Sequence, residues 1–231
     1  MVTALVTGAN RGMGLEFCRQ LAARGDRVIA TCRRPSPELQ ALEVRIVEGI
    51  DMTSDEAIAR LAGTLAGEPI DWLVLNAGIM QRMSLGELDF AALRHELDVD
   101  ALGPLCVVQA LLPNLGRGAR IALITSRMGS IADNSSGGYY GYRMAKAALN
   151  MAGVSLARDL AGRGIAVTML HPGMVHTDLL YGGAGSAART PPRAGVVTPD
   201  VAVRDMLLRI DALTLETSGR FVHRDGSVLP W

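Results

Sequence analysis

The sequence almost lacks lysine: Lys146 is the only one among 231 residues, whereas arginine occurs 22 times. Aromatic residues are also scarce, at 4% of the chain. Basic and acidic residues balance at 23 each, so the chain has no excess of positive charge of the kind that binds nucleic acids or anionic membranes. We therefore expect neither a nucleic-acid partner nor a membrane partner.

Cysteine is sparse as well. Cys18, Cys32 and Cys106 are far apart and odd in number, which favours buried free thiols in a reducing compartment over disulfides, a redox pair or a metal site. The four histidines also lack metal-ligand spacing. The first residues lack the basic region of a signal peptide, and no apolar run approaches the ~20 residues of a membrane span. These absences predict a soluble cytoplasmic protein that holds no metal.

Short apolar runs alternate with longer amphipathic stretches, in a chain that is 49% hydrophobic and 20% charged. The runs barely alternate in polarity, which is typical of strands buried on both faces. Strand–helix alternation indicates an α/β fold with a parallel sheet and helices on both faces. We predict one Rossmann-type, doubly wound domain over residues 1–231. The predicted strands are 2–7, 27–32, 44–49, 71–76, 120–125 and 165–170, and the predicted helices are 14–25, 54–67, 88–115 and 142–164.

The stretch TGANRGMG, residues 7–14, links the first predicted strand to the first predicted helix. Gly8, Gly12 and Gly14 allow a tight turn and a close approach of backbone to ligand, and the helix N-terminus offers free N–H groups to a pyrophosphate. The alternative is a glycine-rich turn that binds nothing. The position between a buried strand and an amphipathic helix favours a dinucleotide site.

Two arginines, Arg33 and Arg34, follow the second predicted strand, and no acidic residue accompanies them. A carboxylate near this position favours NAD, whereas arginine accommodates the 2′-phosphate of NADP. Arg11 in the glycine stretch is positioned to contact the same phosphate. The alternative is a pair of solvated surface arginines. The sequence favours NADP.

Three of the four tyrosines lie in YYGYRMAK, residues 139–146. Tyr142 and Lys146 have the i, i+4 spacing that places both on one helix face, and an ammonium close to a phenol lowers its pKa from about 10. Such a tyrosine can protonate a carbonyl oxygen. Tyr139 and Tyr140 do not share this spacing and are expected to line the approach to the site. The alternative is a surface pair on an amphipathic helix.

Hydroxyl side chains follow the fifth predicted strand, at the sheet edge where ligands bind in such folds. Ser126 ends that strand and is placed to orient a carbonyl. Thr125, Ser130, Ser135 and Ser136 are alternatives, since many such hydroxyls only cap turns. Residues 179–199, rich in glycine, alanine and proline, are expected to form a mobile loop that covers the substrate. We interpret His171 as structural.

Together TGANRGMG, NAG (76–78), ITS (124–126), YRMAK (142–146) and HPGMVHT (171–177) resemble the short-chain dehydrogenase/reductase family, in their order and across the whole chain. Within it, the chain is similar to carbonyl-reductase-like members and to bacterial C-factor. The resemblance implies a seven-stranded sheet in the order 3-2-1-4-5-6-7, with RFVHRDGSVLPW (220–231) supplying the last strand. It implies Tyr142 as general acid/base, Lys146 as its partner and Ser126 as the group that orients the carbonyl. The residues assigned to the cofactor are Gly8, Asn10, Arg11, Gly12, Met13, Gly14, Arg33, Asp51, Met52, Asn76, Ala77, Gly78, Tyr142, Lys146, Pro172, Gly173, Val175 and Thr177.

One position departs from the family pattern. Asp100 stands where the family has an asparagine whose main-chain carbonyl is thought to hold a water beside the lysine. We expect this main-chain role to survive and the Asp100 side chain to add a negative charge near Lys146. Asp100 should therefore belong to the catalytic group and weaken turnover without abolishing it.

The sequence thus predicts an NADP-dependent oxidoreductase that acts on a small carbonyl or alcohol, with NAD less favoured. The other function considered is a cofactor-binding signalling protein of C-factor type with little turnover. The resemblance also implies a homodimer or homotetramer formed through the helices at 88–115 and 142–164.

Overall fold

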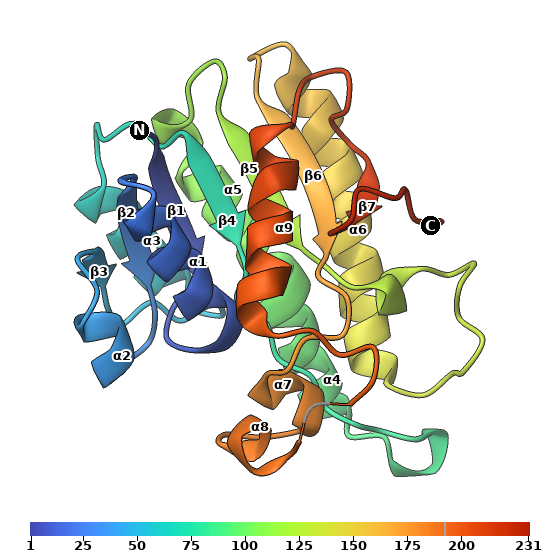
Figure 1. The fold of residues 1–231 in the computed structure, drawn as a ribbon. Helices are drawn as coiled ribbons and strands as arrows, with labels where there is room; N and C mark the ends of the chain where they lie inside the picture. The colour runs from blue at the N-terminus through green and yellow to red at the C-terminus, as the bar shows by residue number, and fades with distance from the viewer. Residues whose placement is uncertain (192) are drawn as a thin grey trace.

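The computed structural model describes residues 1–191 and 193–231, and its centre is a seven-stranded parallel sheet (Figure 1). The strand order is β3-β2-β1-β4-β5-β6-β7, so the predicted fold and order are confirmed. Each β-to-β pair runs parallel, for example Leu5 of β1 beside Ile29 of β2. The strands are β1 (Thr3–Thr7), β2 (Arg27–Thr31), β3 (Arg45–Val47), β4 (Trp72–Leu75), β5 (Arg120–Ile124), β6 (Ala166–His171) and β7 (Phe221–His223).

Both faces of the sheet are covered by helices, which explains why the strands do not alternate in polarity. In β1, Ala4 and Val6 point into one apolar cluster and Leu5 into the other. Helices α1 and α9 cover the first face, and α3, α5 and α6 cover the second (Figure 1). The longer helices are α1 (Gly12–Ala23), α3 (Asp55–Thr64), α4 (Phe90–Leu97), α5 (Gly103–Ala110), α6 (Tyr140–Ala161) and α9 (Pro199–Asp211), and the short ones are α2 (Pro37–Gln40), α7 (Asp178–Tyr181) and α8 (Ser186–Arg189).

The short helices α2, α7 and α8 were not predicted, and the longer helices differ from the sequence predictions at three places. The predicted helix 88–115 is α4 and α5 joined by a π-helical turn at Asp98–Leu102, and such turns are common at functional sites. Helix α6 begins at Tyr140, directly after Tyr139 in a left-handed conformation with φ of 52°. Helix α9 was not predicted; a proline at its first position begins it.

Other helix boundaries follow capping signals in the local sequence. Ser54 caps α3, since its hydroxyl accepts the N–H of Ala57 at 3.1 Å. Gly25 and Gly164 follow α1 and α6 with φ of 82° and 73°, the left-handed conformation expected at a helix C-terminus.

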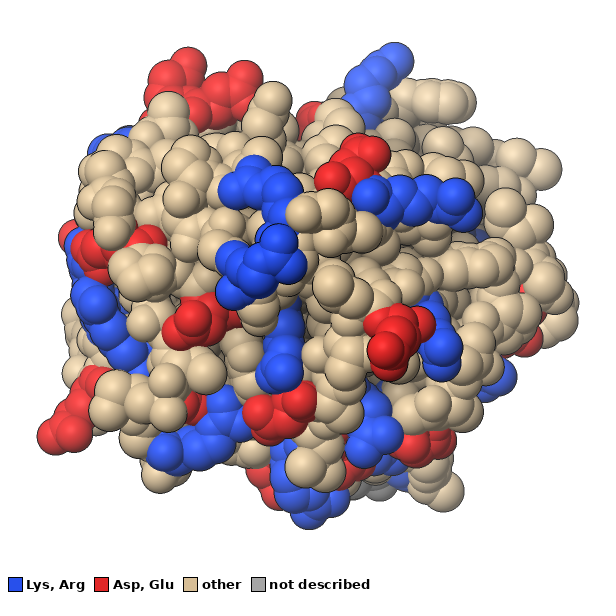
Figure 2. Space-filling view, turned by 90° about the horizontal axis from the view of Figure 1, so that it is seen from above, with Lys and Arg blue, Asp and Glu red and all other residues tan. Residues whose placement is uncertain are grey.

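The face at which the strands begin carries intermixed charges (Figure 2). Arg27 and Arg45 both pair with Glu68, and Arg24 pairs with Asp26 and Asp211. Blue and red atoms alternate over this surface, so positive charge does not gather into a stripe there. Such mixing fits the balanced composition rather than a polyanion-binding face.

No helix in the described part of the chain has both the length and the apolar character needed to cross a membrane. Within residues 1–191 and 193–231, no cluster of three His, Cys, Asp or Glu side chains is arranged to hold a metal ion. The three cysteines are free thiols, with Cys18 and Cys32 buried. Burial raises the pKa of Cys18 to about 12, with the neighbouring Cys32 adding to the shift.

Candidate active site

The glycine stretch after β1 packs directly against the segment after β4. Gly8 and Gly12 have φ of 66° and 56°, which side chains rarely adopt. A Cβ on Gly8 would lie 2.8 Å from the Cα of Ala77, and one on Gly14 would lie 2.6 Å from Nδ2 of Asn76. Only glycine therefore allows this loop to lie so close to 76–77.

Asn76 and Thr7 tie these two strand ends together. The Asn76 side chain donates to the carbonyl of Thr7 at 3.0 Å. The Thr7 hydroxyl accepts the N–H groups of Asn76 and Ala77 at 3.0 and 3.1 Å. Asn76 thus supports the loop, in addition to reaching the cavity that the loop borders.

A cavity of about 1080 Å³ opens along these loops. Twelve of the residues assigned to the cofactor line it: Gly8, Asn10, Arg11, Gly12, Met13, Arg33, Asp51, Met52, Asn76, Ala77, Gly78 and Thr177. Gly14 lies behind the loop against Gly8, and Pro172, Gly173 and Val175 are not among the described lining residues. Lining residues without a role in the sequence analysis include Cys32, Ile79, His95, Val99 and Asp178.

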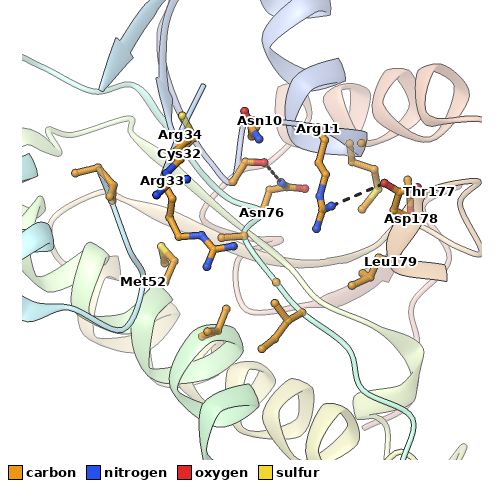
Figure 3. A pocket seen from close by; sticks show the side chains of 18 of the residues that line it. Asn10, Arg11, Cys32, Arg33, Arg34, Met52, Asn76, Thr177, Asp178 and Leu179 are labelled. Carbon is orange, nitrogen blue, oxygen red and sulfur yellow. Dashed lines mark hydrogen bonds and ion pairs between the residues drawn. The ribbon is translucent and has the colours of Figure 1, made fainter. Parts of the chain in front are cut away.

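Arg33 and Arg11 reach the cavity from opposite sides (Figure 3). Arg33 extends from the end of β2, close to Arg34, and Arg11 points toward Asp178, with Nη1 and Oδ2 3.8 Å apart. Burial raises the pKa of Asp178, but the N–H groups of Ala187 and Gly185 and the Arg11 charge together hold it below its usual value. The Arg11 side chain therefore has the Asp178 carboxylate as an acidic neighbour. The Arg33 side chain is exposed beside the cavity.

Ser126, Tyr142 and Lys146 come together in the interior, at exposures of 7%, 7% and 4%. Lys146 Nζ lies 5.6 Å from the centre of the Tyr142 ring and donates to the carbonyl of Ile124 at 3.2 Å. The Ser126 hydroxyl accepts the N–H of Met128 at 3.1 Å, and its proximity lowers the pKa of Tyr142. The helix α6 and the end of β5 thus bring together the three side chains that the sequence singled out.

The cluster lies behind Gly78 as seen from the cavity. A Cβ on Gly78 would lie 3.5 Å from Nζ of Lys146 and 3.1 Å from Oδ2 of Asp100. Gly78 also lines the cavity, so the absence of a side chain there leaves the lysine next to the cavity wall.

Asp100 is fully buried in the π-helical turn and points at the lysine. Its Oδ2 lies 3.1 Å from Nζ of Lys146, and its Oδ1 accepts the N–H of Ile79 at 2.8 Å. The sequence led us to expect a negative charge of Asp100 near Lys146, and the structure places its carboxylate in a direct ion pair with that lysine.

This ion pair changes the electrostatics of the phenol. Burial raises the pKa of Tyr142; Lys146 and the Ser126 hydrogen bond lower it, and Asp100 and Glu96 raise it, so that it stands above its usual value. The prediction that Lys146 would bring the phenol toward the working range is thus not met in this structure. Burial lowers the pKa of Lys146, but Asp100 and Tyr142 raise it above its ordinary value, so the lysine stays charged.

The rival hydroxyls have other partners. Thr125 donates to Asn150 at 2.7 Å, Ser130 accepts the N–H of Asp133 at 3.1 Å, and Ser136 accepts from Arg143 at 2.8 Å. Ser135 is exposed in the loop before α6. Ser126 is therefore the hydroxyl best placed beside Tyr142.

His171 lies at the end of β6, with its ring centre 5.4 Å from that of His223. Burial, followed by the neighbouring His223, lowers the pKa of His171 to about 3, so the ring is neutral near pH 7. This agrees with a structural role.

These observations bear on whether a dinucleotide fits. Side chains at Gly8 or Gly14 would collide with the backbone at the loop, and the loop leads into the N-terminus of α1. Arg33 and Arg34 border the same cavity. A glycine-rich loop at a helix N-terminus suits a pyrophosphate, and the arginines suit a further phosphate.

Comparison with known proteins gives the same picture. The family model described as short chain dehydrogenase matches residues 2–182. The chain is 41% identical over 233 residues to 1-hydroxy-2-glutathionyl-2-methyl-3-butene dehydrogenase of Rhodococcus sp. (strain AD45), covering 100% of both chains. It is 46% identical over 166 residues to C-signal of Myxococcus xanthus, covering 71% of this chain and 93% of that protein.

Among solved structures, the fold is similar to that of the NADPH-bound carbonyl reductase from chicken fatty liver. The TM-score is 0.89 at 32% sequence identity, over 100% of this chain and 99% of the other. The match spans the entire sheet and its helices, including the segment after residue 182.

Proposed function

The chain belongs to the short-chain dehydrogenase family, and we propose that it is an NADP-dependent oxidoreductase that interconverts a carbonyl and an alcohol. The observation that carries the proposal is the buried cluster of Ser126, Tyr142 and Lys146, set behind Gly78 next to the cavity of the glycine loop. A phenol, a hydroxyl and an ammonium at these places provide a proton donor, a group to orient an oxygen and a fixed positive charge.

In the reducing direction, the Ser126 hydroxyl orients the substrate oxygen and Tyr142 donates its proton to that oxygen. Lys146 stabilises the phenolate that remains, because it stays charged beside Asp100. The bound cofactor supplies the hydride. The residues proposed to hold it are the glycine loop, Asn76 to Gly78, Asp51 and Met52, with Pro172, Gly173, Val175 and Thr177 after β6.

The substrate side is proposed to lie against residues 179–199. The described part of this range contains the end of α7 and all of α8; residue 192 lies outside the described residues. Asp178 holds the N–H groups of Gly185 and Ala187 at 2.9 and 3.0 Å, so α8 is anchored at the cavity. We propose that this segment covers the substrate and selects it.

The test of the activity is the oxidation of NADPH by the purified protein with a panel of aldehydes and ketones. The panel includes the oxidised form of a glutathione-conjugated alcohol, because the Rhodococcus relative is named for such a substrate. We expect turnover in the parent and a loss of at least about 100-fold in Tyr142→Phe, in keeping with the 10²–10⁴-fold typical of acid–base groups. NADPH binding should persist in that variant. Turnover that survives Tyr142→Phe would contradict the assignment.

C-signal of Myxococcus xanthus keeps a second candidate in view, a cofactor-binding signalling protein. Burial and the Asp100 carboxylate beside Lys146 raise the pKa of Tyr142, although Lys146 lowers it, and a raised pKa favours slow turnover. Tight NADPH binding with no turnover across the panel would support this candidate. A melting temperature that NADPH does not raise would argue against both candidates.

The choice of NADP is tested at Arg33. We expect Arg33→Asp to raise the ratio of NADH to NADPH efficiency by tenfold or more, because a carboxylate repels the 2′-phosphate and accepts from the ribose hydroxyl. Arg158→Asp, an exposed charge reversal on α6 away from the cavity, is the matched control. An unchanged ratio in Arg33→Asp would refute the assignment.

A further inference from the structure

Two carboxylates on the side of the α4 helix that faces the active site are completely buried. Glu96 lies in the last turn of α4 and Asp100 lies four residues later in the π-helical turn; both side chains have 0% exposure. The sequence analysis gave Glu96 no role. A buried carboxylate is costly unless it is bonded, so its contacts indicate what it does.

Each carboxylate accepts one backbone N–H from the segment that follows β4. Asp100 Oδ1 accepts the N–H of Ile79 at 2.8 Å, and Glu96 Oε1 accepts the N–H of Gln81 at 2.6 Å. Four residues of helix advance by about 6 Å, and two residues of extended chain advance by about 6.6 Å. The i, i+4 carboxylates therefore match alternate amides of the segment, and we name this arrangement the carboxylate clamp.

The clamped segment borders both parts of the site. Gly78 and Ile79 line the cavity, and Gly78 separates it from Lys146. Met80 lies between the two bound amides in the chain. A shift of residues 79–81 would therefore move part of the cavity wall.

The second oxygen of Glu96 faces the start of α6. A Cβ on Gly141 would overlap Oε2 of Glu96 and would lie 2.8 Å from Cδ2 of Leu93. Gly141 directly precedes Tyr142 on α6. The Glu96 carboxyl therefore packs against the turn that carries the phenol, and within the described residues its Oε2 has no hydrogen-bond donor.

The bond to Gln81 does not require a negative charge on Glu96. Burial raises the pKa of the carboxyl, the N–H of Gln81 lowers it, and the nearby Asp100 raises it further, so that it stands above its usual value. A neutral carboxyl retains the oxygen that accepts from Gln81. An amide in place of the carboxyl retains that oxygen as well.

We propose that Glu96 is a positioning residue for the dehydrogenase site: its carboxyl holds the 79–81 segment and the first turn of α6 in register, so that a substrate oxygen meets Tyr142. The proposal rests on the proposed function of this site. Glu96 acts through Gln81 and Gly141 and touches neither substrate nor cofactor.

Two substitutions separate the role of the oxygen from that of the packing. Glu96→Gln keeps the acceptor, and Glu96→Leu keeps comparable bulk without it. We expect Glu96→Gln to hold kcat/KM for the carbonyl substrate within about threefold, and Glu96→Leu to lower it by about tenfold or more, since small misplacements cost up to about 100-fold. The Kd of NADPH should change less than threefold in both, because Arg33 and the glycine loop lie outside the clamp. Parental kcat/KM in Glu96→Leu, or equal losses in the two variants, would overturn the proposal.

A second measurement does not depend on turnover. Amide hydrogen exchange of the peptide containing residues 79–83 should be faster in Glu96→Leu and parental in Glu96→Gln and Tyr142→Phe. Parental exchange in Glu96→Leu would overturn the clamp. If the variants show this exchange pattern but the parent protein reduces no carbonyl, then the proposed function fails and the clamp stands.

Gly141→Ala provides a variant that keeps Glu96. Its methyl group would displace Oε2, and we expect a comparable fall in kcat/KM, with faster exchange at 79–83. This variant applies if Glu96→Leu does not fold. Parental activity and parental exchange in Gly141→Ala would count against contact between Glu96 and α6 as a determinant of the site.

Discussion

Lys146 lies between a phenol and a carboxylate, 5.6 Å from the ring centre of Tyr142 and 3.1 Å from Asp100. Truncating one partner of such a buried pair leaves the other charge uncompensated, which is strongly destabilising. The charge of Lys146 therefore compensates the Asp100 carboxylate and also lowers the pKa of Tyr142. At the scale of single residues, Asp100 is the side chain that most changes the proposed chemistry.

Asp100→Asn tests whether Lys146 acts on both Asp100 and Tyr142. Asparagine keeps an oxygen for the N–H of Ile79 but removes the charge that raises the pKa of Tyr142 and of Lys146. Both pKa values should fall, so the rise of alcohol oxidation with pH, which requires phenolate, should move to lower pH. We also expect the variant to be at least as active as the parent near pH 7.

The measurement is kcat/KM for alcohol oxidation as a function of pH, with melting temperature as a check on folding. A profile that stays in place or moves to higher pH would contradict the electrostatic role. An Asn variant less active than the parent would contradict the expectation that Asp100 weakens turnover.

At the scale of elements, α6 links the active site to the sheet. Its first two turns carry Tyr142 and Lys146, and farther along Gly153 allows it to approach β5 and β6. A Cβ on Gly153 would overlap Sδ of Met169 and lie 2.8 Å from Cδ1 of Leu123. The same face of one helix thus sets both the depth of the lysine and the packing of the core.

Gly153→Ala should therefore destabilise the protein, although alanine is the better helix former. Overpacking a core costs roughly 1–3 kcal/mol, and we expect a fall of that size in the free energy of unfolding, measured with urea. Gly63→Ala in α3, where a Cβ meets nothing within 4 Å, is the matched control. It should raise stability by roughly 0.5–1 kcal/mol; a similar gain in Gly153→Ala would show that α6 is not tightly packed.

At the scale of the whole molecule, α5 and α6 present an apolar outer surface. Leu102, Leu105 and Met151 are exposed, Met151 at 68%, and they border a groove with Ala148 and Leu156. The predicted pairing through the helices at 88–115 and 142–164 would cover this surface. The homodimer or homotetramer remains a prediction.

Met151→Glu tests the prediction of an oligomer. A charge at the centre of the surface should dissociate the parental oligomer into monomers, measured by size-exclusion chromatography with light scattering, because burying it unpaired is costly. Leu208→Glu on α9, a similarly exposed apolar residue on the other side of the sheet, should leave the mass unchanged. A monomeric parent would disprove the prediction.

The sequence by itself determined what local geometry controls. Helical spacing selected Tyr142 and Lys146 and separated them from Tyr139 and Tyr140, and strand–helix alternation predicted the parallel sheet. The glycine stretch and Arg33 could be placed because they directly follow buried strands. These features depend on residues within a few positions of one another, so the pattern of the chain was sufficient to predict them.

Only the tertiary structure decided which distant residues meet. Asp100 reaches Lys146 across 46 positions of sequence, Glu96 reaches back to Gln81 from α4, and Arg11 meets Asp178 across the cavity. The pattern of the predicted helix 88–115 gave no sign of the π-helical turn. Asp100 stood out as a departure from the family pattern, and its i, i+4 spacing from Glu96 was the signal available for Glu96. The pKa of Tyr142 follows from these long-range contacts, since burial and neighbouring charges exist only once the chain has folded.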